Sequence, residues 1–305
     1  DKVVMDGTIN MVNGGANVTA DQEVELNGTL NMVNGGANIS TTEGAITLQG
    51  SETANGALGD MIGGVLGDAA GSVGESGILD NLKGNANVVT GEGTKLDAAT
   101  DVNMNGTVNL VNDKAQVEAT NKVTMEGTIN IVKDATVTTN AGAITLQGLG
   151  NVVTGADALL NAATNIEMSG SVNVVSGGAS LNADIITLQG SGEAGLLVDD
   201  FIPEEYKEIV DKVGATDVLD NELNVNVVAG SGTNIHATTD IEMVATGNVV
   251  ADNAQLIAGN NVNMTGAANV VTGGASVDAE ANVNMEGVAN TIGDNATVEG
   301  TEVNM

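Results

Sequence analysis

The chain has 305 residues, with 40 Asp and Glu, 8 Lys and no Arg, so its formal net charge at pH 7 is −32. This charge repels nucleic-acid phosphates and anionic lipid and leaves few basic side chains for phosphate contacts, so no nucleic-acid partner is expected. The chain has no Cys, which excludes disulfides and thiolate metal sites. It also has no apolar run of about 18 residues, so no membrane-spanning helix is expected.

One short pattern recurs about every 20 to 22 residues, with two longer gaps. Its consensus is V-x-M-x-G-x-x-N-x-V, followed by a Gly-rich turn and A-x-V-x-A. In chain order, three copies begin before residue 51, five more before 191 and three after 223, and a further copy starts near the end of the chain. The third residue of the pattern identifies each copy: Met5, Leu26, Leu48, Met104, Met125, Leu146, Met168, Leu188, Met243, Met264 and Met285.

Alternation within each copy predicts strands. Val102 and Met104 flank Asn103, and Ala115, Val117 and Ala119 alternate with polar residues. Such period-two runs, interrupted by Gly, Asn and Asp, are typical of strand, turn and strand. One copy buries too little surface to fold alone, so neighbouring copies must stack. The sequence therefore predicts an all-β fold, a single parallel β-solenoid over residues 1–305 with about 11 coils. At about 4.8 Å per coil, its rod would be about 53 Å long.

One polar residue keeps its place in every copy. Stacking brings these amides into register, where each can donate to the next and accept from the one before. A buried amide without such partners would destabilise the fold by about 1–3 kcal/mol. A preference of Asn for turns would explain one occurrence but not eleven, so we expect a structural Asn ladder: Asn10, Asn31, Asn87, Asn109, Asn130, Asn151, Asn173, Asn226, Asn248, Asn269 and Asn290.

The residue two after each ladder Asn is Val, or Ile292 in the last copy, which predicts a β-branched core column. The residue between the two, from Met11 to Val270, is mostly apolar as well. With strict alternation this middle column faces outward and forms an apolar stripe along the rod. With a bend in the chain it lies inside. The sequence leaves both arrangements open.

Two insertions, 51–84 and 191–223, interrupt the third and eighth copies after the matching stretches AITLQGS and IITLQGS. Flanking matches indicate a duplicated block of about five coils with one arm each. Apolar spacing predicts that both arms are at least partly helical. Each arm packs on its own rod or contacts a neighbouring molecule; for the second alternative, the expected contact residues are Leu58, Ile62, Leu66, Phe201, Tyr206 and Ile209.

No catalytic constellation stands out, and no enzyme activity is expected. Carbohydrate cleavage needs paired carboxylates, whereas the outward ones are scattered among Asn and Thr: Glu25, Glu118, Glu167 and Glu242. His236 is the only His, and a lone surface imidazole is more often solvated than catalytic. No cofactor or specific metal site is expected. Weak, nonspecific Ca²⁺ binding by the 40 acidic groups stays open.

The stretches GGANVTADQEVELNG (14–28) and GGASLNADIITLQG (177–190) resemble the coil repeats of filamentous haemagglutinins and related secreted bacterial β-solenoid adhesins. The resemblance covers nearly the whole chain outside the two insertions. It implies an exported, rod-like protein that is adhesive or forms fibres, at the cell surface or in the extracellular space. The start of the chain at Asp1 also leads us to expect a processed, exported protein.

The chain starts and stops within a coil strand, so a solenoid with uncapped ends is expected. Such ends stack head to tail, and a contact of that kind that does not close gives a filament. We therefore expect a non-catalytic subunit of an extracellular filament, with itself as partner and with end contacts at Val3, Met5, Val303 and Met305. The alternatives are the shaft of a larger surface adhesin and, third, a β-helix protein that binds or cleaves polysaccharide. A cell surface or matrix polysaccharide stays open as a further partner.

Overall fold

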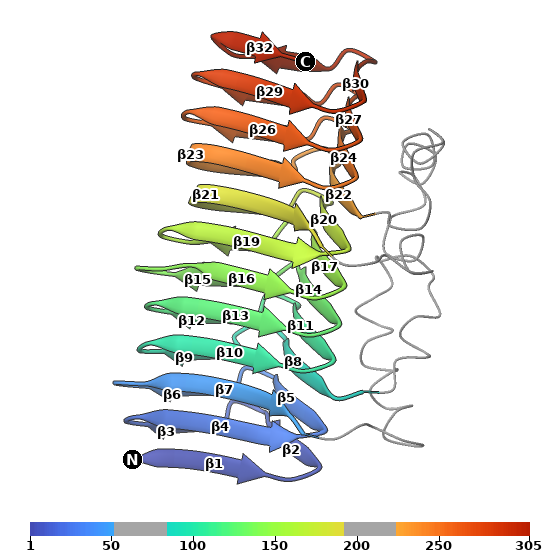
Figure 1. Ribbon diagram of the computed structural model, residues 1–305. Coiled ribbons are helices and arrows are strands. Elements are labelled where there is room, and N and C mark those ends of the chain that lie inside the picture. The colour runs from blue at the N-terminus through green and yellow to red at the C-terminus, as the bar shows by residue number, and fades with distance from the viewer. Residues whose placement is uncertain (52–83, 192–223) are drawn as a thin grey trace.

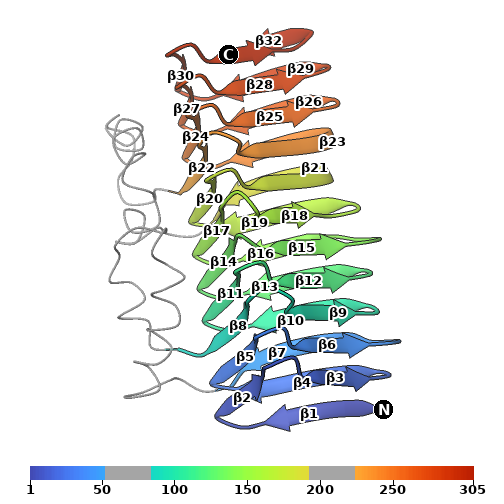
Figure 2. The same ribbon diagram turned by 180° about the vertical axis from the view of Figure 1, so that it is seen from behind.

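The structure is a computed structural model that describes residues 1–51, 84–191 and 224–305. These residues form a stack of short strands, a parallel β-solenoid of eleven coils with the two termini at opposite ends of the rod (Figures 1 and 2). The expected fold class is therefore confirmed. The described residues contain no α-helix, and none of them forms an apolar helix of bilayer-spanning length.

Each coil contributes three strands. The first strands are β1 (Lys2–Asp6), β4 (Glu23–Gly28), β7 (Ala45–Gly50), β10 (Asp101–Asn105), β13 (Lys122–Glu126), β16 (Ile144–Gln147), β19 (Asn165–Gly170), β26 (Asn261–Thr265), β29 (Asn282–Glu286) and, after the last complete coil, β32 (Glu302–Asn304). The second strands are β2 (Ile9–Val12), β5 (Leu30–Asn34), β8 (Ala86–Thr90), β11 (Val108–Asn112), β14 (Ile129–Lys133), β17 (Gly150–Thr154), β20 (Val172–Ser176), β22 (Val225–Ala229), β24 (Gly247–Ala251), β27 (Ala268–Val271) and β30 (Ala289–Ile292).

The third strands are β3 (Asn17–Ala20), β6 (Asn38–Thr41), β9 (Lys95–Ala98), β12 (Gln116–Ala119), β15 (Thr136–Thr139), β18 (Leu159–Asn161), β25 (Gln255–Ala258), β28 (Ser276–Ala279) and β31 (Thr297–Glu299). At two places the third strand runs directly into the first strand of the next coil, in β21 (Ser180–Gly190) and β23 (Asn234–Val244). The second strands form an 11-stranded sheet, and all other strands form a 21-stranded sheet.

Strands pair in parallel with the equivalent strands of the neighbouring coils, on both sides within the rod and on one side at its ends. Asn109 of β11, for example, lies between Asn87 and Asn130. The register is kept throughout because a shift of one residue would turn each buried column to the outside. Within the described residues, the strand pairing has one register shift, between Ala183 and Ile185 in the pairing of β21 with β23.

Neither insertion interrupts the stack. β8 pairs with β5 although residues 52–83 intervene, and β22 pairs with β20 across residues 192–223. The first residues after each insertion repeat one contact, since Oδ1 of Asn85 and of Asn224 accepts the backbone N–H of Thr107 and Thr246 respectively, both at 2.7 Å. This match agrees with a duplicated block. The helices expected at 51–84 and 191–223, and the contact residues Leu58, Ile62, Leu66, Phe201, Tyr206 and Ile209, lie outside the described residues.

The core fills the inside of the coils with stacked aliphatic columns. Met104 of the first strand, Val111 of the second and Val117 of the third are all fully buried. At about 25 cal/mol per Å² of apolar surface, burying a side chain of this size stabilises the fold by about 1.5–3 kcal/mol. Because every coil repeats the same inward positions, the core runs without interruption along the rod.

The middle column of the second strands faces outward but is buried. Leu110 alternates with the inward Asn109 and Val111, which fits strict alternation, yet both Leu110 and its neighbour Ile131 are almost fully buried. The 11-stranded sheet is thus buried on both faces from β5 to β24, as parallel sheets usually are. The apolar column does not form an exposed stripe there.

Candidate functional site: the amide ladder and the end surfaces

The eleven recurring Asn side chains form one chain of hydrogen bonds along the rod. Each Nδ2 donates to the Oδ1 of the next coil at 2.8–2.9 Å, from Asn10 to Asn290 without a break. From Asn31 to Asn269 these side chains have no exposed surface. The ladder even crosses both insertions, since Asn31 donates to Asn87 and Asn173 donates to Asn226.

A second bond ties most of these amides to a backbone carbonyl at the corner of the coil. Asn109 Nδ2 also donates to the backbone carbonyl of Glu126 at 2.9 Å, and Asn130 Nδ2 donates to that of Gln147 at 3.0 Å. One Asn therefore joins the second strand of its own coil to the first strand of the next. Buried polar groups contribute stability only when they are paired in this way.

The ladder has a direction. Every amide donates towards the C-terminal end of the rod, so the two ends differ chemically. Among the described residues no donor bonds Oδ1 of Asn10, and Nδ2 of Asn290 donates only to the carbonyl of Met285 in its own coil, at 2.8 Å. The first coil thus presents an amide acceptor, and the last presents an amide donor.

The consensus Gly beside the ladder has a packing role that the sequence analysis missed. A Cβ on Gly127 would overlap the carbonyl oxygen of Gly106 and lie 2.9 Å from Asn109 Nδ2. Gly170 and Gly266 stand in the same relation to the coil before them. The absence of a side chain therefore lets the ladder amide and the preceding coil come close. The repeated M-x-G-x-x-N spacing was the signal for this contact.

The first and last coils carry the exposed apolar side chains. The described chain has eight large exposed hydrophobic residues. Leu149 lies mid-rod, and the other seven lie in the first coil, in the last complete coil or at the strand β32 that follows it: Val4, Ile9, Met11, Val288, Ile292, Val303 and Met305. We define the N-end surface as Val3, Met5, Ile9, Met11 and Val18. We define the C-end surface as Val288, Ile292, Val298, Val303 and Met305. Some core residues of these coils, such as Val3, Val18 and Val298, are only partly buried because no further complete coil covers them.

The four end residues expected from the sequence lie on these surfaces. Val3 and Met5 of β1 are partly buried against the core, while Val303 and Met305 are 42% and 61% exposed. The structure places the two pairs at opposite ends of the rod, so one molecule does not bring them together (Figure 1). They can meet only between molecules.

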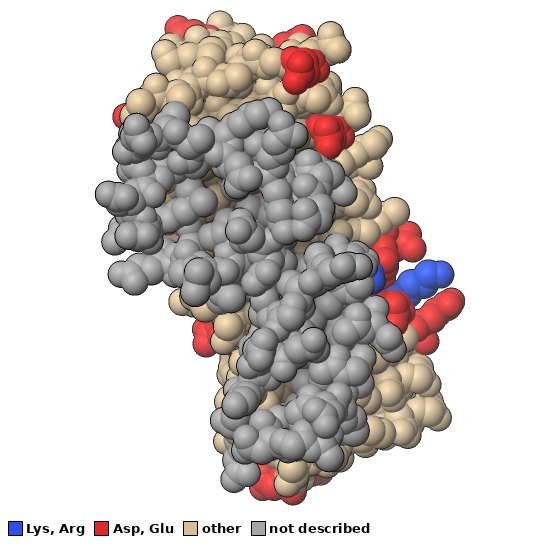
Figure 3. Space-filling view, turned by 90° about the vertical axis from the view of Figure 1, so that its right-hand side faces the viewer, with Lys and Arg blue, Asp and Glu red and all other residues tan. Residues whose placement is uncertain are grey.

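Lys side chains bridge carboxylates of adjacent coils. Lys2 Nζ lies 2.7 Å from Glu25 and 3.1 Å from Glu23. The hydrogen bond from Lys2 lowers the pKa of Glu25 despite partial burial, and the same bonds raise the pKa of Lys2. Asp and Glu side chains also lie at both ends of the rod (Figure 3).

The second bridge lies on the third strands. Lys95 Nζ lies 2.8 Å from Glu118 and 3.0 Å from Asp97. Burial alone would lower the pKa of Lys95, but its bonds to Glu118 and Asp97 outweigh burial and raise it. These bridges reduce the repulsion between stacked acidic coils, and the sequence analysis did not identify them.

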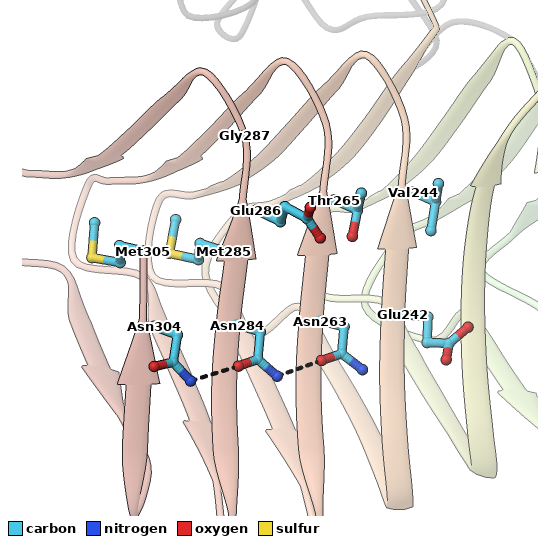
Figure 4. Close-up of a pocket in the computed structure, with 10 residues that line it drawn as sticks. All are labelled: Glu242, Val244, Asn263, Thr265, Asn284, Met285, Glu286, Gly287, Asn304 and Met305. Carbon is cyan, nitrogen blue, oxygen red and sulfur yellow. Dashed lines mark hydrogen bonds between the residues drawn. The ribbon is translucent and has the colours of Figure 1, made fainter.

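An open groove of about 680 Å³ lies on the outer face of the last coils, beside β32 (Figure 4). A second, short amide ladder runs along it, in which Asn304 donates to Asn284 at 2.9 Å and Asn284 donates to Asn263 at 2.8 Å. Glu242 and Glu286 are the two carboxylates among its lining residues. No group of three or more His, Cys, Asp or Glu side chains is arranged for a metal ion within residues 1–51, 84–191 and 224–305.

The remaining sequence candidates stay apart. Glu25 and Glu118 take part in the Lys bridges, whereas Glu167 and Glu242 are exposed on β19 and β23. His236 is exposed on the outer side of β23. The described structure brings none of these four carboxylates together with His236.

No family model, curated protein or solved structure matches this chain. The geometry of the rod and of its ends is therefore the basis for a functional conclusion.

Proposed function

We propose that this protein is a non-catalytic structural subunit of an extracellular filament and that its rods join head to tail. The observation that carries the proposal is the concentration of exposed apolar side chains in the first and last coils. Water-exposed strand edges with apolar flanks favour pairing with another edge of the same kind. The N-end and C-end surfaces have the same strand geometry because every coil repeats it.

The direction of the ladder supports a head-to-tail contact. If coil 1 of one molecule follows coil 11 of another, Asn290 donates to Asn10 and the ladder continues. The same register places Ile292 against Val12 and Val298 against Val18, which continues two core columns. If two N-end surfaces met instead, the Asn10 Oδ1 acceptors of the two molecules would face each other with no donor between them. A head-to-tail contact of this kind does not close on itself, so it produces a filament.

A second candidate is the shaft of a larger surface adhesin. It is favoured by the resemblance of residues 14–28 and 177–190 to the coils of filamentous haemagglutinins. In that case further coils of the same polypeptide, rather than a second molecule, would cover the end surfaces. In both proposals another coil stacks on each end surface of the rod; the proposals differ in whether that coil belongs to a second molecule or to the same polypeptide.

Sedimentation and electron microscopy of the purified chain test the filament. We expect rods whose lengths are multiples of about 53 Å, increasing with protein concentration. The variant Ile292→Lys should stop assembly because it places a charge under Val12 of the next molecule. Leu149→Lys is the matched control: Leu149 is 40% exposed and Ile292 38%, but Leu149 lies mid-rod, so assembly should persist. Single rods at every concentration, for the full chain and for the chain ending at Gly300, would contradict the filament and favour the shaft.

A further inference from the structure

The last strand, β32, occupies the place that β1 of a second molecule would need. β32 pairs with β29 through Val283 and Val303 and through Asn284 and Asn304. β1 is also a first strand of a coil, and it pairs with β4 at the equivalent positions, through Val3 and Val24. When coil 1 of a second molecule stacks on coil 11, its β1 must lie on β29, where β32 already lies.

The two strands share the same inward residues. β32 and the residue after it read Val303-Asn304-Met305, and β1 contains Val3-Val4-Met5. In both, Val stands where it covers Val283 and Met where it covers Met285. Met285 is 2% exposed and Val283 is fully buried, so the first strand of coil 11 is already covered. The residues of β30 and β31, by contrast, remain partly or fully exposed.

β32 is held by few contacts. It pairs over three residues, whereas β1 pairs with β4 over five. All three of its residues are exposed. Within the described residues its one side-chain hydrogen bond runs from Asn304 to Asn284, and Thr301 just before it donates to the Glu280 carbonyl, both at 2.9 Å. A second molecule would bring three connected strands at once, β1, β2 and β3, and would cover Asn290, Ile292 and Val298 together with β29.

We infer that β32 is a displaceable mimic of β1 that covers the docking site for the next molecule, so that head-to-tail joining requires β32 to leave β29. The inference rests on the proposed filament and adds the identity of the junction. The bond from Asn290 to Asn10 of the next molecule and the pairing of β32 with β29 exclude each other. The occupant of the freed site is β1 of a second copy of this chain.

A reversible lock tests this directly. Asn284 and Asn304 are paired on adjacent strands, whose spacing of about 4.8 Å suits a disulfide. The native chain has no Cys, so the double variant Asn284→Cys/Asn304→Cys forms no other bridge within the chain. When oxidised, it should fail to form filaments; when reduced, it should form them as the unaltered chain does. Equal assembly in both states would overturn the inference and leave the filament standing.

Removing the strand provides an independent variant. A competitor that occupies a site 90–99% of the time weakens apparent affinity about ten- to a hundredfold. A chain ending at Gly300 should therefore assemble at a concentration about ten- to a hundredfold lower than residues 1–305. Val303→Asp keeps the full chain length but weakens the contact of β32 with Val283, so it should also lower the concentration needed for assembly. An unchanged concentration for both variants would overturn the inference. If neither the truncated nor the full chain assembles, the proposed filament fails as well.

Cysteine pairs distinguish the two ways in which rods could join. With β32 displaced, Met11 of one molecule lies beside Thr291 of the other. With β1 added onto β32 instead, Val4 would lie beside Asn304. Preparations of Met11→Cys and Thr291→Cys, mixed and oxidised, should form mixed dimers, while Val4→Cys and Asn304→Cys should not. The opposite result would show that β32 stays in place.

Discussion

The interior coils and the end coils are made from the same repeat but differ in what their side chains contact. Asn130 is fully buried, accepts from Asn109 and donates to Asn151 and Gln147. Asn290, with the same position in its coil, is only partly buried and has no following amide within the described chain. Val132 is fully buried, whereas Ile292 of the same column is 38% exposed.

This difference arises from the architecture and not from the composition of the coils. In a solenoid each repeat is stabilised mainly by its two neighbours, so an end repeat lacks about half of its contacts. The ends therefore combine the lowest local stability with the largest exposed apolar surface. For this reason we propose that the interior coils keep the rod rigid and that the end coils make the contacts with other molecules. The first three pairs of variants below compare an interior residue with its end counterpart, and the last pair compares a carboxylate bonded to Lys2 of the first coil with an interior carboxylate.

The largest effect is expected in the core. Met125→Ala removes a fully buried side chain and should lower the free energy of unfolding by about 2–5 kcal/mol. Met5→Ala, the same change in the partly covered first coil, should lower it by about 1 kcal/mol or less. Chemical denaturation followed by circular dichroism measures both values. Equal losses would mean that the end coil is as well packed as the interior.

The ladder should respond next most strongly. Asn130→Leu keeps the volume but leaves Asn109 without its acceptor and Asn151 without its donor, and it removes one of the two hydrogen bonds to the Gln147 carbonyl, which keeps the one from the Gly127 N–H. The expected loss is about 2–3 kcal/mol, since each unpaired buried group destabilises by about 1–3 kcal/mol and neighbours can relax. Asn290→Leu should lower stability by less, about 1 kcal/mol, because it leaves only one N–H of the buried Asn269 amide unpaired and water reaches Asn290 itself. A similar loss for both variants in the same denaturation assay would contradict a buried, saturated interior ladder.

A smaller loss is expected beside the ladder. Gly127→Ala places a methyl group against the carbonyl of Gly106 and the amide of Asn109, and overpacking of this kind destabilises by about 1–3 kcal/mol. Gly7→Ala is the control in the first coil, where no earlier coil approaches and the nearest atom lies 3.2 Å away. We expect Gly7→Ala to change the melting temperature little. A larger effect of Gly7→Ala would disprove the close-approach explanation.

The smallest effect is electrostatic. Because Lys2 lowers the folded-state pKa of Glu25, the unfolded chain binds more protons in this range, so the bridge adds stability above the unfolded pKa of Glu. That contribution is lost as the pH falls through the lower folded pKa. Glu25→Gln should therefore weaken the acid dependence of stability slightly, and less so in high salt, as for an exposed ion pair.

Glu167→Gln is the control for this charge effect, because its neighbours in the register are Thr145 and Thr187. Thermal melting between pH 3 and 7 measures both variants. If Glu167→Gln changed the acid dependence as much as Glu25→Gln does, the Lys2 bridge would have no part in it.

The fold could be predicted from the sequence because every coil of a solenoid must place apolar and hydrogen-bonding residues at the same positions, which leaves a repeated pattern in the sequence. The alternation around Met104 and the recurrence of Asn at one position each required stacked, in-register coils, and the structure has both. The structure also stacks the eleven Asn amides one above the other. In contrast, alternation showed only that Leu110 faces outward. Its burial depends on what packs across the sheet, and no local pattern encodes that.

The junction was visible to sequence analysis only in part. The apolar residues Val3, Met5, Val303 and Met305 pointed to the ends, but a list of end residues does not show that two of the strands compete for one place. That conflict follows from the register of β32 on β29. The Lys2 and Lys95 bridges were missed for a similar reason, since their partners are about 20 residues away in sequence and become neighbours only after stacking.

The axial repeat of the filament, measured by electron cryo-microscopy of the chain and of its form ending at Gly300, tests the central claim most directly. Eleven coils at about 4.8 Å give a predicted rise of about 53 Å per subunit, with strands spaced evenly across each junction. A rise of about 58 Å would preserve the filament but retain β32 as a twelfth layer. Isolated rods in both preparations would contradict the claim that the end coils are the interacting surfaces of this protein.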